Sequence, residues 1–218
     1  MTLFVINPNS SQAVTDGIDA AIDPLRALGR NIICDTLHEG PPGIENQLQA
    51  DLVIAPLMLR AQALMPQASG VVIACFGDPG LFSLRHALPV PVWGIQESAV
   101  MTALMQGQRF GVIAILPAST PRHLRAFGAM GVMDRLAGDR ALGLGVADLA
   151  DPDTCFARMT EIGTALRDRD GADVLILGCA GMAQYRKPLE AALGLPVIDP
   201  CQAAVSMALG HLALKEST

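Results

Sequence analysis

Short apolar runs alternate with helical stretches along the chain, and this alternation limits the possible folds more than any other feature. Eight runs have the length and composition of strands, at residues 3–6, 31–34, 70–75, 91–95, 110–116, 141–146, 173–179 and 196–199. Strands that alternate with helices form βαβ units, in which neighbouring strands run parallel. Only 17% of the residues are charged and the mean hydropathy is +0.39, so both faces of each sheet are expected to be covered. The sequence predicts an α/β protein.

The second half of the chain repeats motifs of the first. Residues 91–100 (PVWGIQESAV) and 196–205 (PVIDPCQAAV) match at four positions with an offset of 105, and Cys75 and Cys179 end similar apolar runs 104 residues apart. A weaker echo links INPNSS near the N-terminus to ILPAST at 115–120. A repeat of this length is too long for a solenoid unit. We predict two similar lobes, each a mostly parallel four-stranded sheet flanked by helices, related by a pseudo-twofold axis with the active site in the cleft between them.

The boundary between the lobes is expected near the sequence ALMQGQRF, where a helix ends at Gly107 and a new strand begins. The first lobe then covers residues 1–104 and the second covers residues 105–201. The last helix, within residues 202–218, is predicted to pack back on the first lobe.

Composition and charge exclude several classes of protein. The longest apolar run, residues 52–59, is too short to span a bilayer, and the N-terminus lacks the basic residues of a signal peptide. A net charge of −6 without a Lys/Arg cluster argues against nucleic acid as a partner. Five cysteines, an odd number, fit a reducing cytoplasm, and no motif has the spacing of metal ligands. We expect a cytoplasmic protein, with no membrane or metal site, that forms a homo-oligomer and acts on a small molecule.

Cys75 and Cys179 each follow a buried strand and precede a loop of small residues. Parallel sheets bind ligands beyond the carboxyl ends of their strands, so two lobes would present two thiols to one cleft. Positive potential at helix N-termini is expected to lower a thiol pKa toward neutrality. A thiolate facing a thiol can remove a proton from a carbon next to a carbonyl and return one to the opposite face, without a cofactor. Backbone N–H groups of the glycine-rich turns would hold the enolate oxygen.

The motifs INPNSS, ACFGDPGL, LGCAGMA and LPVID resemble those of the hydantoin and allantoin racemases, in the aspartate/glutamate racemase superfamily, from Leu3 to about Val205. The resemblance implies a two-lobed α/β fold with catalytic cysteines at Cys75 and Cys179. It also implies a substrate cleft that the loop from Asn7 to Asn9 contacts. The expected reaction is cofactor-independent inversion of the α-carbon of a 5-substituted hydantoin or of allantoin.

The motif loops supply candidate substrate contacts suited to a neutral cyclic ureide, which needs amide-type donors and acceptors. These candidates are Asn9, Ser10, Ser11, Phe76, Gly77, Gly178, Ala180 and Gly181. No cation occurs near the motifs before Arg85, and no histidine follows Gly181, unlike in glutamate racemases, so a free amino acid is disfavoured. The family's usual threonines after the fifth strand are replaced here by the sequence Ile-Ala-Ile at 113–115.

Other chemically notable residues are interpreted as structural. Cysteines without a matched partner are expected in the core, histidines at the surface or in packing roles, and Asp78 in a turn. These cysteines are Cys34, Cys155 and Cys201, and the histidines are His38, His86, His123 and His211. Asn9 or Ser10 is expected to cap the first helix.

Other functions remain open at this stage. The same fold supports maleate-isomerase-like chemistry, in which a thiolate attacks an alkene, and amino-acid racemase chemistry. Arylmalonate-decarboxylase-like chemistry resembles a one-cysteine site, which two matched thiols argue against. A non-enzymatic two-lobe binder would need neither thiol, and a redox pair would need the two cysteines within disulfide distance.

Overall fold

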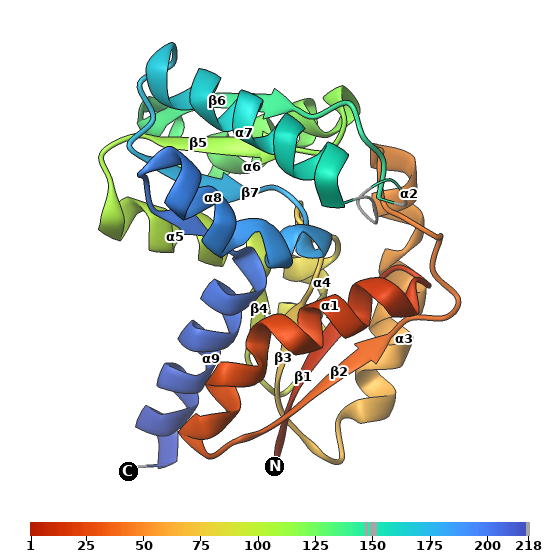
Figure 1. Ribbon diagram of the computed structural model, residues 1–218. Helices are drawn as coiled ribbons and strands as arrows, with labels where there is room; N and C mark the ends of the chain where they lie inside the picture. The colour runs from red at the N-terminus through yellow and green to blue at the C-terminus, as the bar shows by residue number, and fades with distance from the viewer. Residues whose placement is uncertain (147, 149–151, 217–218) are drawn as a thin grey trace.

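The computed structural model describes residues 1–146, 148 and 152–216 (Figure 1). The strands are β1 Thr2–Asn7, β2 Asn31–Thr36, β3 Ala68–Ile73, β4 Val92–Gly94, β5 Phe110–Ala114, β6 Leu136–Ala141, β7 Val174–Leu177 and β8 Val197–Ile198. The α-helices are α1 Gln12–Ile22, α2 Gln47–Leu52, α3 Ile54–Leu64, α4 Leu81–Ala87, α5 Ile95–Gln106, α6 Thr120–Met130, α7 Pro152–Asp168, α8 Arg186–Leu193 and α9 Pro200–Glu216. Short 3-10 helices are η1 Asp23–Leu28, η2 Pro117–Ser119, η3 Met133–Arg135 and η5 Ala180–Tyr185.

The strands form two parallel four-stranded sheets with the same topology. The first has the order β2-β1-β3-β4 and the second the order β6-β5-β7-β8, and all six strand pairs are parallel. Helices flank both sheets, and the second sheet lies above the first in Figure 1. The predicted fold class is therefore confirmed: two parallel four-stranded sheets flanked by helices.

The sixth strand lies earlier than the sequence predicted. The apolar run at residues 141–146 was expected to form it, but β6 pairs with β5 through residues 136–141. This strand carries Asp139 and Arg140 and is only partly buried, because it is an edge strand with one neighbour. The apolar residues after it form a connection in which the Leu142 N–H donates to Ala114 O. An apolar run therefore does not mark this strand, because an edge strand can contain charged residues.

Both sheets are buried on both faces, as their apolar runs require. In β1, Leu3 and Val5 face one hydrophobic cluster, whereas Phe4 and Ile6 face another. The first cluster also contains Phe110 and other residues of the second sheet, together with residues of α5 and α9. A single core therefore joins the two halves of the chain.

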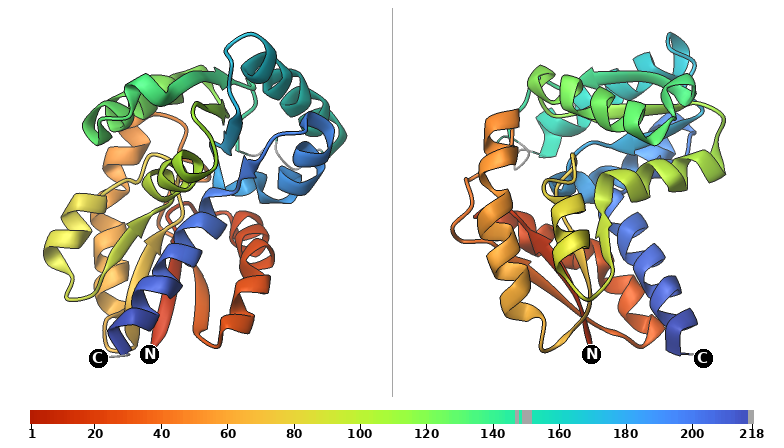
Figure 2. Two further views of the ribbon diagram at one scale, coloured as in Figure 1. Left: turned by 90° about the vertical axis from the view of Figure 1, so that its left-hand side faces the viewer. Right: turned by 180° about the vertical axis from the view of Figure 1, so that it is seen from behind.

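Helix α9 runs beside the first sheet, where it contacts α1, α5 and β3 (Figure 2). It begins at Pro200, and residues 217–218 of the predicted last helix lie outside the described part of the chain. The division into lobes at residues 104 and 105 stays a prediction. No helix in the described ranges has the length and apolarity needed to cross a membrane.

Candidate active site

Two strand ends carry Cys75 and Cys179 to one cavity. Cys75 lies two residues beyond the end of β3 and Cys179 two residues beyond the end of β7. Both line a cavity of about 20 Å³, which has room for about one water molecule. Because β3 and β7 belong to different sheets, each half of the chain contributes one thiol.

The structure brings half of the predicted contact residues to this cavity. Asn9, Phe76, Gly178 and Ala180 line it with the two cysteines. A groove of about 440 Å³ adjoins the cavity and is lined by Ser11 and Gly181 among others. Within the described residues, Ser10 and Gly77 line neither the cavity nor the groove.

The loop from Asn7 to Asn9 is held by its own amides. Asn9 Oδ1 accepts from Asn7 Nδ2 at 3.0 Å and from the Ser11 N–H at 2.9 Å. Both contacts use the amide oxygen, so the NH₂ group of Asn9 is the part left for a ligand. The expected cap at Asn9 or Ser10 is wrong by one or two positions, because Ser11 is the N-cap and its Oγ accepts from the Val14 N–H at 3.4 Å.

Burial controls the acidity of both thiols. It raises the pKa of Cys75 to about 12, and the Arg122 guanidinium partly offsets this whereas Cys179 raises it further. Burial also raises the pKa of Cys179 to about 11, although the Gly181 backbone N–H lowers it. The expected lowering toward neutrality is therefore wrong for this closed cavity, because loss of hydration outweighs the backbone donors. Both thiols are neutral at pH 7, and a thiolate at Cys179 disfavours a second negative charge at Cys75.

Asp78 fixes the loop after Cys75. Its backbone has the left-handed φ of 47°, and its carboxylate accepts from the N–H groups of Gln96 at 2.8 Å and Glu97 at 2.9 Å. A side chain at Gly94 would collide with this carboxylate. Burial raises the pKa of Asp78 to about 7, although the two backbone donors lower it. These contacts at the start of α5 support the structural interpretation of Asp78.

Replacing Asp78 with alanine is expected to lower the free energy of unfolding by about 2 kcal/mol. The change removes a helix cap and places alanine at a left-handed φ. Asp78→Asn should cost about half as much, because asparagine tolerates that φ and keeps one acceptor. Urea unfolding followed by circular dichroism measures both, with the exposed Asp134→Ala as control. A loss below 0.5 kcal/mol in D78A would show that the cap is dispensable.

Sequence reasoning missed two polar residues of the cavity, Ser119 and Arg122. Arg122 is only 8% exposed and lies in the first turn of α6. No motif marks either residue. The echo between INPNSS and ILPAST was the available signal, since it matches the loop after β5 to the cavity-lining loop after β1.

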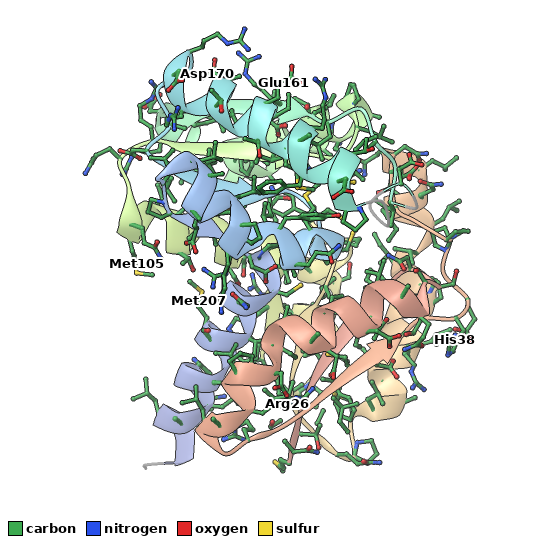
Figure 3. All side chains as sticks on the ribbon, in the orientation of Figure 1. Arg26, His38, Met105, Glu161, Asp170 and Met207 are labelled. Atoms are coloured by element: carbon green, nitrogen blue, oxygen red, sulfur yellow. The ribbon has the colours of Figure 1, made fainter. Side chains whose placement is uncertain are left out.

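The remaining cysteines and histidines lie mostly in packing or surface positions. Cys155 and Cys201 are fully buried and Cys34 is partly buried. His38 is exposed at the edge of the molecule (Figure 3). His123 is buried, and its Nδ1 lies 2.7 Å from Asp139 Oδ2.

The family model and the relatives that match this chain agree on one family. A family model described as Asp/Glu/Hydantoin racemase matches residues 3–208. The hydantoin racemase of Pseudomonas sp. (strain NS671) is 34% identical over 212 residues, which cover 95% of this chain and 84% of the relative. The hydantoin racemase of Paenarthrobacter aurescens is 34% identical over 223 residues, covering 100% of this chain and 94% of the relative.

A solved structure agrees with these relatives. The allantoin racemase from Klebsiella pneumoniae superposes with a TM-score of 0.94 at 33% identity, covering 99% of this chain and 89% of that one. The resemblance drawn from the sequence motifs is confirmed, and the chain belongs to the Asp/Glu/Hydantoin racemase family, a family of isomerases.

Proposed function

We propose that the protein racemises a 5-substituted hydantoin or allantoin by proton transfer between Cys75 and Cys179. The observation that carries this proposal is the placement of two thiols, one from each sheet, on a single cavity. The relatives named hydantoin racemase and allantoin racemase support the choice of a cyclic ureide.

The reaction needs only these two sulfur atoms as acid and base. One cysteine first loses its proton to solvent. Its thiolate takes the proton from ring carbon C5, and the C–H electron pair forms a C4=C5 double bond as the carbonyl electrons move onto the C4 oxygen. The facing thiol then gives its proton to C5 from the opposite side, and the carbonyl re-forms. The first cysteine ends as a thiol and the second as a thiolate, so atoms and charge balance without a cofactor.

The closed cavity is smaller than a ureide ring, so binding requires the two halves to separate locally. One contact between the two halves at the rim of the cavity joins Glu45 and Val146, where the Val146 N–H donates to Glu45 Oε1 at 2.8 Å. Val146 and Ala180 line both the cavity and the adjoining groove. The groove gives the C5 substituent a place beside the ring.

The deciding experiment follows both enantiomers of a 5-alkylhydantoin and of allantoin by proton NMR and polarimetry in D2O. We expect α-proton exchange to accompany loss of optical rotation, at a rate above that in buffer, and the faster substrate to identify the physiological class. Absence of exchange on every ureide would reject the proposal. A stable thioether adduct with maleate would then favour maleate-isomerase-like chemistry.

We further propose a cytoplasmic location, which the odd number of cysteines, five, supports. Self-association into a homo-oligomer also stays a proposal, which light scattering of the purified protein would test.

A further inference from the structure

A buried cation lies beside the two thiols. Arg122 lines the cavity with Cys75 and Cys179, and its guanidinium lowers the pKa of both. Among the described residues, no carboxylate forms an ion pair with it. Buried arginines are normally paired, because an uncompensated charge away from water is costly. Within the described residues, this arginine therefore lacks a compensating negative charge.

Several hydrogen-bond donors at the cavity have no partner. Arg122 Nε and Nη1 are buried and, in the described part of the chain, bond to nothing. Ser119 Oγ, also buried and on the same cavity wall, is likewise unpartnered. Buried polar atoms are nearly always hydrogen-bonded, so a group of orphan donors around one cavity indicates a ligand that accepts hydrogen bonds.

The structure positions Arg122 through its packing on Gly77 and through the anchoring of its helix. The guanidinium packs on the Gly77 backbone, where an added Cβ would lie 2.6 Å from Nε. Asp139 also anchors the first turn of α6, which carries Arg122, because it accepts from Thr120 Oγ1 at 3.2 Å and pairs with His123. The His123 ring also packs edge-on against Phe76, with centroids 4.9 Å apart. A side chain fixed in this way is preorganised for one ligand position.

We propose that Arg122, assisted by Ser119, binds the ring carbonyl oxygen that becomes the enolate oxygen during proton transfer. This inference rests on the proposed function and assigns the site a role beyond the two cysteines. A cyclic ureide is neutral when it binds, and negative charge appears on the C4 oxygen only after C5 loses its proton. A fixed cation in a closed cavity stabilises such a charge far more than it stabilises the neutral carbonyl. The expected oxyanion site thus includes a side-chain cation and not backbone N–H groups alone.

The kinetic test compares Arg122→Gln, Arg122→Lys and Ser119→Ala with wild type. R122Q is expected to lose about 10²–10³-fold in kcat, with little change in KM, because the contact forms in the transition state. R122K should keep part of the kcat that R122Q loses, because lysine keeps the positive charge but lacks the planar guanidinium with its paired N–H donors. The decrease in kcat should be smaller for S119A than for R122Q. The exposed Arg169→Gln serves as the matched control and should leave kcat unchanged.

A pH profile separates this role from a purely structural one. Arg122 lowers the pKa of both thiols, so its removal raises them and reduces the thiolate fraction at a given pH. The rising limb of kcat/KM should therefore move to higher pH in R122Q and return toward its wild-type position in R122K. An unmoved limb together with kcat within threefold of wild type overturns the proposal.

Binding of barbiturate tests the site without catalysis. Barbiturate is a cyclic ureide that is already an enolate anion at neutral pH, and calorimetry gives its affinity for wild type and R122Q. We expect barbiturate to bind R122Q at least tenfold more weakly than wild type. If this is found and wild type racemises no hydantoin, the proposed function fails and the oxyanion site stands. Equal binding by both proteins, or binding by neither, overturns the oxyanion site whatever the kinetics show.

Discussion

Replacing Cys75 or Cys179 with serine is expected to slow racemisation by about 10³-fold or more. A serine hydroxyl is a far weaker acid than a thiol, so it neither supplies nor accepts the proton at a useful rate. Each variant keeps one working sulfur on one face of the substrate. Each should therefore still exchange the α-proton of one enantiomer in D2O without inverting it, and the two variants should prefer opposite enantiomers.

Proton NMR with each enantiomer separately measures exchange, and polarimetry measures inversion. Cys34→Ser is the matched control, because Cys34 is partly buried on β2 and lines a different groove. The control should keep wild-type activity. If both active-site variants racemise within tenfold of wild type, the paired-thiol mechanism is wrong. If both lose exchange of both enantiomers while remaining folded, the two sulfurs act in one step and not as separate bases.

Replacing Phe110 with alanine is expected to lower the free energy of unfolding by about 3–5 kcal/mol. Phe110 is fully buried at the start of β5 and packs edge-on against Phe127, with centroids 5.3 Å apart. It belongs to the core cluster that joins the two sheets, so the cavity left by truncation would weaken both halves together. Most domains have only about 5–15 kcal/mol of stability in total, and the loss is correspondingly large.

Urea unfolding followed by circular dichroism measures this change. Phe82 offers a control of the same chemistry, because its side chain is 77% exposed and Phe82→Ala should stay within about 0.5 kcal/mol of wild type. We also expect one cooperative transition for wild type and for F110A, since one core spans both halves. A loss below about 1 kcal/mol would mean that the core repacks around the missing ring.

The two-sheet fold and the pairing of the two cysteines were predictable because they depend on local sequence patterns. Strand length, apolar burial on both faces and glycine-rich turns are properties of neighbouring residues, and they correctly predicted two parallel four-stranded sheets. The matched positions of Cys75 and Cys179 followed from the same repetition. The sixth strand was missed because an edge strand pairs on one side only and tolerates Asp139 and Arg140 within it.

By itself, the sequence determined the α/β fold, the doubled topology and the two strand ends that carry the thiols, because each depends on short-range pattern. Only the tertiary structure decided what surrounds those thiols. It brought Arg122 of α6 to the same cavity, packed it over Gly77, and buried both sulfurs so that their pKa values rise. The burial of the two thiols and their interaction with a cation distant in the sequence depend on how the two sheets pack against each other. No local sequence pattern specifies that packing.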